Sequence, residues 1–236
     1  MRILGIIPAR GGSRGIPGKN LALVAGRPLI SYTFDAARAS RRLARAIVST
    51  DSDAVAALAR AEGIDVPFLR PAELAGDDTA MLPVLQHAID ALGGERPDAV
   101  VLLQPTSPLR RPEHIDEAID LFERSGADSV VSVTAVPHQF TPGSLMQVEE
   151  NGRLVALVPG PAPTRRQDKP LLYARNGPAV LVTRTAVLDS GRLYGDTVRP
   201  YVMSRQDSLD VDEPFDLELV EAVLTRRLRA AGAPVA

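Results

Sequence analysis

The residues best suited to chemistry lie in one short loop near the start of the chain. Residues 10–19 contain four glycines together with Arg10, Arg14 and Lys19. Glycine lets backbone N–H groups approach an anion closely, and the three cationic side chains can neutralise several negative charges. The apolar run Ile3–Ile7 precedes the loop and is typical of a buried first strand. A basic, glycine-rich loop after such a strand predicts a binding site for a polyphosphate.

This loop matches neither of the two common phosphate-binding motifs. A Walker A motif needs a glycine five residues before the Gly18-Lys19 pair and a Ser or Thr after it. The sequence has Ser13 and Asn20 at these places. The glycines at 11, 12, 15 and 18 do not supply the Gly-x-Gly-x-x-Gly of dinucleotide-binding proteins either. The sequence therefore predicts a third type of phosphate loop.

Two carboxylates near the end of the chain form a candidate metal site. Asp210 and Asp212 are two residues apart in a segment expected to be extended, so the strand period puts both on one face. Such a pair can share a Mg²⁺ ion, which neutralises charge on phosphate oxygens. Two other interpretations stay open. Asp212 and Glu213 can favour the start of a helix at Pro214, and Asp-x-Asp also occurs in nucleotide-sugar glycosyltransferases.

A second polar site is predicted where another strand ends. Gln104 follows the apolar run Val100–Leu103, which places it at the ligand-binding edge of an α/β sheet. Its amide can both donate and accept hydrogen bonds, which suits sugar hydroxyls. Farther along the chain, Arg165 and Arg166 are suited to an anionic substrate.

Composition and periodicity predict a single α/β domain over residues 1–236, with a mostly parallel sheet flanked by helices. A net charge of −2 and the absence of cysteine argue against a nucleic-acid or anionic-membrane surface, a disulfide framework and thiolate-bound zinc. No signal-peptide pattern or apolar run of about 18 residues is present, so we expect a cytoplasmic protein. Strands are expected at 3–7, 46–50, 100–103, 130–133, 180–183 and 200–203; helices are expected after Pro28, at 53–62, after an N-cap at Thr79, around 115–122 and from Pro214.

The strand–helix pattern stops between residues 137 and 172. This segment is rich in proline, contains the turn dipeptide Asn151-Gly152, and carries the paired arginines. An irregular segment of that length is uncommon in a compact domain unless it is functional or makes outside contacts. The alternative is a disordered excursion.

The run from Ile7 to Asn20 resembles the signature of sugar-activating nucleotidyltransferases, and most closely that of the CMP-sialic acid synthetases, also called acylneuraminate cytidylyltransferases. Segments 69–74, 102–110 and 208–212 match the same family in order and spacing. The resemblance therefore covers nearly the whole chain. It implies a Rossmann-like nucleotidyltransferase fold, the activation of an acidic sugar by CTP with Mg²⁺, and an inserted arm at 137–172. In this family, such an arm builds a homodimer and reaches the partner's active site.

The resemblance also implies roles for individual residues. The sugar hydroxyl attacks the α-phosphorus directly, so no protein nucleophile is required, and the base that takes the proton stays open. Arg10, Lys19 and Asp210 are the expected catalytic residues. The nucleotide is expected to contact Ala9, Arg10, Gly11, Ser13, Lys19, Asn20 and Arg70; the acceptor, Gln104, Arg165, Arg166, Gln167 and Tyr173; the metal, Asp210 and Asp212.

Some positions depart from the family pattern and leave the acceptor open. After Asn176-Gly177, the usual Ala-Ile-Tyr-Ile is replaced by Pro178–Leu181. The acceptor could be a sialic acid, another nonulosonic acid, a 3-deoxy sugar acid or a small phosphonate. The Kdo cytidylyltransferases share the Pro-Ala-Arg opening but fit the following residues less well. A nucleotide-binding protein without catalysis would be expected to lack Lys19, Asp210 or Asp212, and all three are present.

Overall fold

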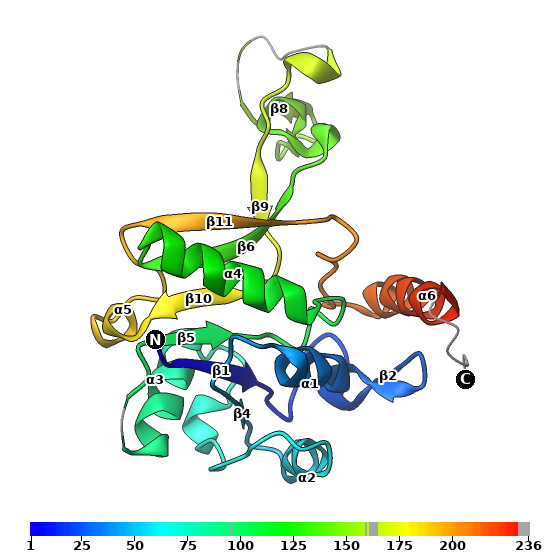
Figure 1. Ribbon diagram of the computed structural model, residues 1–236. Coiled ribbons are helices and arrows are strands. Elements are labelled where there is room, and N and C mark those ends of the chain that lie inside the picture. The colour runs from blue at the N-terminus through cyan, green and yellow to red at the C-terminus, as the bar shows by residue number, and fades with distance from the viewer. Residues whose placement is uncertain (95, 159, 161–164, 231–236) are drawn as a thin grey trace.

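A central mixed sheet organises the protein. The computed structural model describes residues 1–94, 96–158, 160 and 165–230. Within this part of the chain, seven strands form one sheet in the order β11-β6-β10-β5-β1-β4, and β9 also pairs with β6 (Figure 1). The strands of this sheet are β1 (Ile3–Pro8), β4 (Arg45–Ser49), β5 (Ala99–Leu102), β6 (Ser129–Ala135), β9 (Tyr173–Arg175), β10 (Leu181–Arg184) and β11 (Val198–Met203).

The strand directions confirm the predicted mostly parallel sheet. β1 pairs in parallel with β4 on one side and with β5 on the other, and β6 pairs in parallel with β11. β10 is antiparallel to both of its neighbours, β5 and β6, so β6 again runs in the direction of β5. After β1, the chain forms β4 on one side of that strand and then β5 on its other side. Ligands of open α/β sheets bind where the strand order reverses in this way. The carboxyl ends of β1 and β5 meet there.

Helices cover both faces of the sheet because the buried strands are apolar on both sides. Ile3 and Ile7 of β1 pack in a cluster with residues of α1, α2 and α4, whereas Leu4 and Ile6 pack with residues of α3 and α5. α1 and α4 lie side by side on their face (Figure 1). The helices are α1 (Leu29–Ala39), α2 (Asp53–Ala61), α3 (Met81–Leu92), α4 (Pro112–Ser125), α5 (Thr185–Asp189) and α6 (Pro214–Ala230), with short 3₁₀ turns η1 (Lys19–Leu21) and η2 (Ala72–Leu74).

The predicted start of α3 was wrong by one residue. Ala80, not Thr79, is the N-cap, and no side chain caps this helix end. The Thr79 N–H instead donates to the Gly76 carbonyl in the preceding turn, at 3.2 Å. α6 starts at Pro214 as predicted, and its Val220 and Leu224 pack on a separate small cluster that includes Val211.

The segment between β6 and β9 projects away from the sheet (Figure 1). It contains the hairpin of β7 (Met146–Val148) and β8 (Leu154–Ala156), which pair antiparallel. The predicted turn at Asn151-Gly152 joins these two strands, with Gly152 at a φ of 82°. Three short 3₁₀ turns also belong to the segment: η3 (His138–Phe140), η4 (Pro142–Ser144) and η5 (Arg166–Asp168). Among the described residues, none of the helices has the length and apolar composition needed to cross a membrane.

The start of α4 contains a buried histidine. His114 is 5% exposed, and its Nδ1 accepts a hydrogen bond from the Arg111 N–H at 3.1 Å. Burial, reinforced by the charge of Arg111, lowers the pKa of His114, although Asp207 and Glu117 act in the opposite direction. The folded protein therefore holds this histidine neutral at a pH where the unfolded chain binds a proton.

This difference predicts a loss of stability on acidification. Below the ordinary histidine pKa of about 6.5, the unfolded chain gains a proton that the folded chain gains only at lower pH. The melting temperature should therefore fall between pH 7.5 and pH 5, and His114→Asn should make that decline shallower. Thermal unfolding of both proteins across this range measures the effect. Parallel curves for the two proteins would remove His114 from the pH dependence.

Candidate active site

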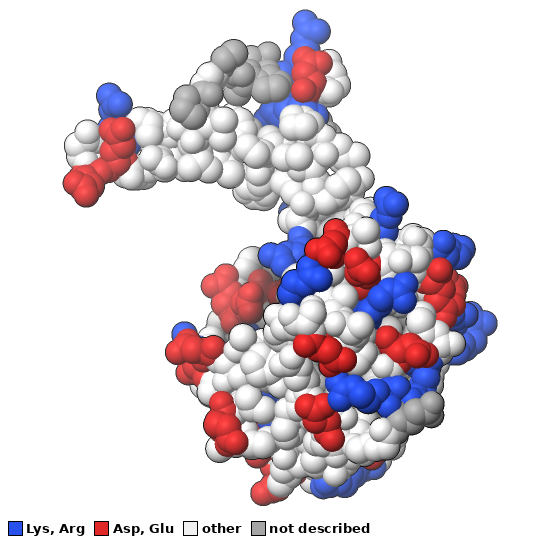
Figure 2. Space-filling view, turned by 90° about the vertical axis from the view of Figure 1, so that its left-hand side faces the viewer, with Lys and Arg blue, Asp and Glu red and all other residues white. Residues whose placement is uncertain are grey.

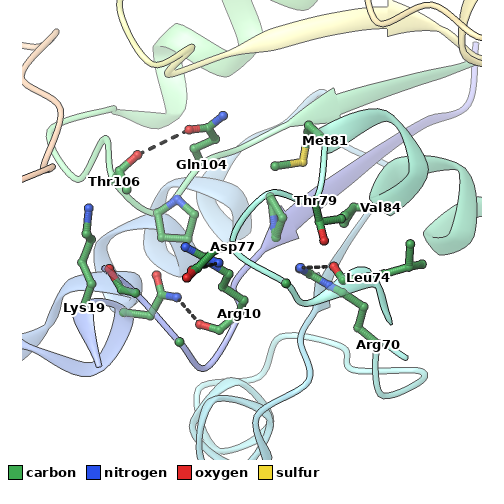
Figure 3. A pocket seen from close by; sticks show the side chains of 16 residues that line it. Arg10, Lys19, Arg70, Leu74, Asp77, Thr79, Met81, Val84, Gln104 and Thr106 are labelled. Atoms are coloured by element: carbon green, nitrogen blue, oxygen red, sulfur yellow. Dashed lines mark hydrogen bonds and ion pairs between the residues drawn. The ribbon is translucent and has the colours of Figure 1, made fainter. Parts of the chain in front are cut away.

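A cavity of about 250 Å³ opens where β1 and β5 end (Figure 3). Three segments supply most of its lining: the loop after β1, the segment from Arg70 to the start of α3, and the loop after β5. Both loops follow parallel strands, so their side chains meet at one edge of the sheet. The lining residues are Pro8, Arg10, Gly12, Ser13, Lys19, Asn20, Arg70, Leu74, Gly76, Asp77, Thr79, Met81, Val84, Gln104, Pro105 and Thr106.

The loop after β1 is held by one hydrogen bond within the loop and by another to the residues that follow β4. The Asn20 side chain donates to the Arg10 carbonyl at 2.9 Å, and the Gly11 N–H donates to Asp51 Oδ1 at 2.9 Å. Of the residues of this loop that are expected to contact the nucleotide, Arg10, Ser13, Lys19 and Asn20 line the cavity, whereas Ala9 and Gly11 do not. Ala9 is buried and continues the pairing of β1 by donating to the Ser49 carbonyl.

Lys19 connects this loop to the segment that carries the aspartate pair. Its side chain is 11% exposed, and Nζ lies 3.5 Å from Asp212 Oδ1. The same Nζ donates to the Val211 carbonyl at 2.7 Å. A Cβ atom on Gly15 would lie 2.3 Å from the Asp212 carbonyl oxygen, so only glycine permits this approach. The two loops are therefore in direct backbone contact.

The aspartate pair lies in a loop between β11 and α6, and no strand is assigned to residues 208–212, where the sequence predicted an extended segment. Val211 is buried between the two carboxylates, and its N–H donates to the Thr106 carbonyl at 2.8 Å. Asp210 Oδ1 accepts from Ser107 Oγ at 3.1 Å, and the Asp212 side chain is 82% exposed. Neither aspartate lines the cavity directly, but their loop is attached to two of its walls.

The donor set fits a magnesium ion that is shared with a phosphate. In the described part of the chain, no group of three or more His, Asp or Glu residues could hold a metal alone. Mg²⁺ is usually bound by one or two carboxylates plus substrate phosphates and water. Two aspartates beside a basic loop meet that requirement.

Carboxylates pair with two of the loop's arginines. Arg10 and Arg14 both form ion pairs with Asp77, and Arg14 also pairs with Asp78. Hydrogen bonds from Arg14, and then from Arg10, lower the pKa of Asp77. Figure 3 shows Asp77 beside Arg10 in the cavity. No pattern in the sequence points to Asp77, because a lone acidic residue in a loop is most often a solvated charge.

Arg70 lies in the cavity wall as a buried cation. It is 6% exposed, and its Nε donates to Ser49 Oγ at 3.1 Å. Nη1 reaches the Leu74 carbonyl at 3.4 Å, and Nη2 donates to the Ser49 carbonyl. Burial lowers the pKa of Arg70 to about 10, so the side chain is still charged at neutral pH. Its contacts fix the turn that leads to Leu74 and the apolar end of the cavity.

The predicted acceptor residues divide into two places. Gln104 lines the cavity, with Thr106 Oγ1 3.5 Å from its Oε1. Arg165 and Gln167 belong to the projecting segment, whereas Tyr173 begins β9, and none of these three lines the cavity of the same chain. The predicted side chain of Arg166 lies outside the described residues.

A second cavity, of about 460 Å³, is lined by Arg175, Gly177, Pro178 and Tyr194. Arg175 Nη1 donates to the Tyr194 hydroxyl at 3.1 Å. Within the described ranges, Arg175 has no carboxylate oxygen within the 4.0 Å of an ion pair. No sequence pattern points to a role for Arg175 or Tyr194. Gly177 also lies against Ser107 and Asp210, so the second cavity adjoins the aspartate loop.

Comparison with known proteins identifies the family. Residues 4–227 match the family described as "Cytidylyltransferase". This chain belongs to that family. A CMP-N,N'-diacetyllegionaminic acid synthase of Legionella pneumophila is 36% identical over 95% of this chain and 97% of its own length. The chain also matches an N-acylneuraminate cytidylyltransferase of Escherichia coli at 29% identity over 97% of this chain, and there it spans about half of the relative, 53%.

A structural comparison supports the fold of this cytidylyltransferase. The structure of a CMP:2-keto-3-deoxy-manno-octonic acid synthetase complexed with CTP superposes with a TM-score of 0.72, covering 97% of this chain and 100% of that one. Only 19% of the aligned residues are identical, so this similarity concerns the fold alone. The nucleotidyltransferase fold expected from the opening motif is confirmed.

The Asp77 ion pairs generate a prediction for nucleotide binding. If Arg10 and Arg14 hold the phosphates, as the sequence predicts, Asp77 competes with CTP for them. Asp77→Asn should then tighten CTP binding about twofold to fivefold, because an exposed ion pair contributes at most about 1 kcal/mol. Isothermal titration with CTP measures the change. Glu73→Gln, on the neighbouring exposed turn, is the matched control. Weaker CTP binding by Asp77→Asn would mean that Asp77 itself helps to hold the nucleotide.

Proposed function

We propose that this cytidylyltransferase transfers CMP from CTP to the hydroxyl of an acidic sugar of the nonulosonic acid class and releases pyrophosphate. One observation carries the proposal: a basic loop and a neutral amide, Gln104, line the same cavity at the carboxyl ends of β1 and β5. The first group suits a triphosphate and the second a sugar. The names of the relatives from Legionella and Escherichia support the same class of acceptor.

The reaction needs positioning and charge stabilisation more than covalent catalysis. The acceptor hydroxyl gives up its proton to a base or to water as its oxygen bonds to the α-phosphorus. The bond from that phosphorus to the oxygen that bridges it to the β-phosphate breaks, and pyrophosphate leaves. Charge grows on the leaving group, and Arg10 and Lys19 are placed to stabilise it from the loop. Arg70 and the apolar residues near Leu74 are suited to the base and ribose. Gln104 would orient the acceptor hydroxyl for attack.

A magnesium ion is part of the proposal, with Asp210 and Asp212 as its protein ligands. When bound, it would neutralise charge on the phosphates and polarise the α-phosphoryl group. The amino group of Lys19 contacts the same loop, so its cation and the carboxylates are held in fixed relation before substrate arrives.

The acceptor is proposed to lie between Gln104 and the second cavity. That cavity presents a guanidinium and a phenol hydroxyl, from Arg175 and Tyr194, which are suited to a carboxylate or an acyl carbonyl. A nonulosonic acid carries both groups. A 3-deoxy sugar acid or a small phosphonate remains the alternative acceptor, because the residues after Gly177 depart from the pattern of the sialic acid enzymes.

We further propose a homodimer in which the projecting segment contacts the second copy. Along this segment the surface has long uncharged stretches, with charges gathered near its ends (Figure 2). Large apolar side chains are exposed there, and clusters of such side chains often mark protein–protein interfaces: Phe140, Met146, Val148, Leu154, Leu157, Val158 and Leu171. A cytoplasmic location is proposed because the reaction consumes CTP and the chain has no cysteine.

The proposed activity predicts release of pyrophosphate that depends on both CTP and an acid. The test panel contains four acids, each assayed with CTP, ATP, GTP and UTP: N-acetylneuraminate, diacetyllegionaminate, a 3-deoxy octulosonate and a small hydroxyphosphonate. Turnover should be largest with CTP and one of the first two acids. Asp210→Asn should lower kcat at least ~10²-fold, as removal of one electrostatic stabiliser does. Binding of CTP without release of pyrophosphate from any acid would instead favour a nucleotide-binding protein without catalysis.

The proposed dimer predicts that the projecting segment acts on the other subunit. Arg165→Ala should raise the KM for the acid and leave the KM for CTP unchanged, whereas Arg153→Ala on the β7–β8 hairpin should change neither. Mixing Arg165→Ala with Asp210→Asn should restore activity, because a mixed dimer has one site with both native residues. Light scattering should show two chains per particle. A monomer, or mixtures no more active than the separate variants, would contradict the arrangement.

A further inference from the structure

A buried hydroxyl donates a hydrogen bond to the carboxylate of Asp210. Ser107 is 1% exposed and donates from Oγ to Asp210 Oδ1 at 3.1 Å. Gly177, at a φ of 118°, lies flat against the same pair: a Cβ there would be 2.9 Å from Ser107 Oγ and 3.3 Å from Asp210 Oδ1. One carboxylate oxygen is therefore enclosed by Ser107 and Gly177. The hydrogen bond fixes the rotation of the carboxylate, which determines where the other oxygen points.

The loop that carries Ser107 also contains a buried cation, Arg110. Arg110 is 3% exposed, and its Nη1 donates to the carbonyls of Gln104 at 3.1 Å and Ala179 at 2.6 Å. Nη2 donates to Thr33 Oγ1 at 2.6 Å. All of these partners are neutral, and Nε has no hydrogen-bond partner among the described residues. A guanidinium buried without a paired carboxylate is costly, and its hydrogen bonds to three neutral oxygens offset part of that cost.

Arg110 is also bonded to the turn that carries Gln104 and Ser107. Its Nη1 donates to the Gln104 carbonyl, and its backbone N–H donates to the Ser107 carbonyl at 3.3 Å. Burial lowers the pKa of Arg110, and attraction to Asp210 acts in the opposite direction.

We propose that Ser107 and Arg110 are positioning residues for Asp210, and that they set the affinity of the aspartate loop for a divalent cation in the presence of CTP. This inference rests on the proposed function of the site. Ser107 fixes the carboxylate, and Arg110 fixes the turn that carries Ser107. The same guanidinium bonds to the Gln104 carbonyl. Arg110 therefore positions both Gln104, which is proposed to contact the sugar, and Asp210, which is proposed to bind the metal.

Binding of Mn²⁺ together with CTP tests the proposal without any acceptor. Electron paramagnetic resonance counts free Mn²⁺ in the presence of saturating CTP. Ser107→Ala should weaken Mn²⁺ binding about fivefold to tenfold, and Ser107→Thr, which keeps the hydroxyl, should restore it. CTP binding in EDTA should be equal in all three proteins. In turnover assays, Ser107→Ala should raise the Mg²⁺ concentration for half-maximal rate by a similar factor.

A matched control separates this role from loss of a buried hydroxyl. Ser129 is 0% exposed and bonds to Thr183 at 3.0 Å, at the opposite end of the sheet. Ser129→Ala should reduce stability but not Mn²⁺ affinity. Arg110→Lys, which keeps a hydrogen-bond donor for the Gln104 and Ala179 carbonyls, should bind Mn²⁺ more tightly than Arg110→Met.

Two results would overturn the assignment. One is equal Mn²⁺ affinity of the wild type and Ser107→Ala. The other is a loss of CTP affinity in EDTA by Ser107→Ala that is as large as its loss of Mn²⁺ affinity. Either result is distinguishable from failure of the proposed function, which would be a wild type that binds Mn²⁺ and CTP but turns over no acid.

Discussion

The approach of the loop after β1 to the loop before α6 is the contact on which the rest of the site depends. Gly15 touches the Asp212 carbonyl, and the Lys19 ammonium donates to the Val211 carbonyl at 2.7 Å. These residues are nearly 200 positions apart in the sequence, at opposite ends of the chain. A side chain at position 15 would separate the two loops. The proposed phosphate-binding cations and the proposed metal ligands would then no longer share one site.

The sheet explains why the remaining groups gather at this place. β1 and β5 are adjacent and parallel, so Arg10 and Gln104, a few residues beyond their carboxyl ends, face one cavity. β10 runs in the opposite direction beside β5, which brings the start of that strand, with Gly177 and Ala179 just before it, to the same edge. The reversed strand therefore adds the second cavity and the wall against Asp210.

Charge balance within the site has a consistent pattern. Exposed arginines of the first loop are paired with exposed aspartates, and such pairs are weak and exchangeable. Arg70 and Arg110 are buried and bonded mainly to neutral oxygens, which holds them in place. The exchangeable cations are suited to a ligand that enters and leaves, and the buried cations to fixing the surfaces around it.

The sequence by itself determined the fold class, the family and most of the cavity's polar residues. Apolar runs of strand length and glycine-rich loops are local signals, and Arg10, Ser13, Lys19, Asn20, Arg70 and Gln104 all lie where their position after a strand or in a motif predicted. Tertiary structure alone decided the Asp77 ion pairs, the enclosure of Asp210 by Ser107 and Gly177, and the buried charge of Arg110. It also decided the loop conformation of residues 208–212 and the N-cap at Ala80. These features depend on segments far apart in the chain, and no local pattern of residue types specifies which side chains such segments bring together.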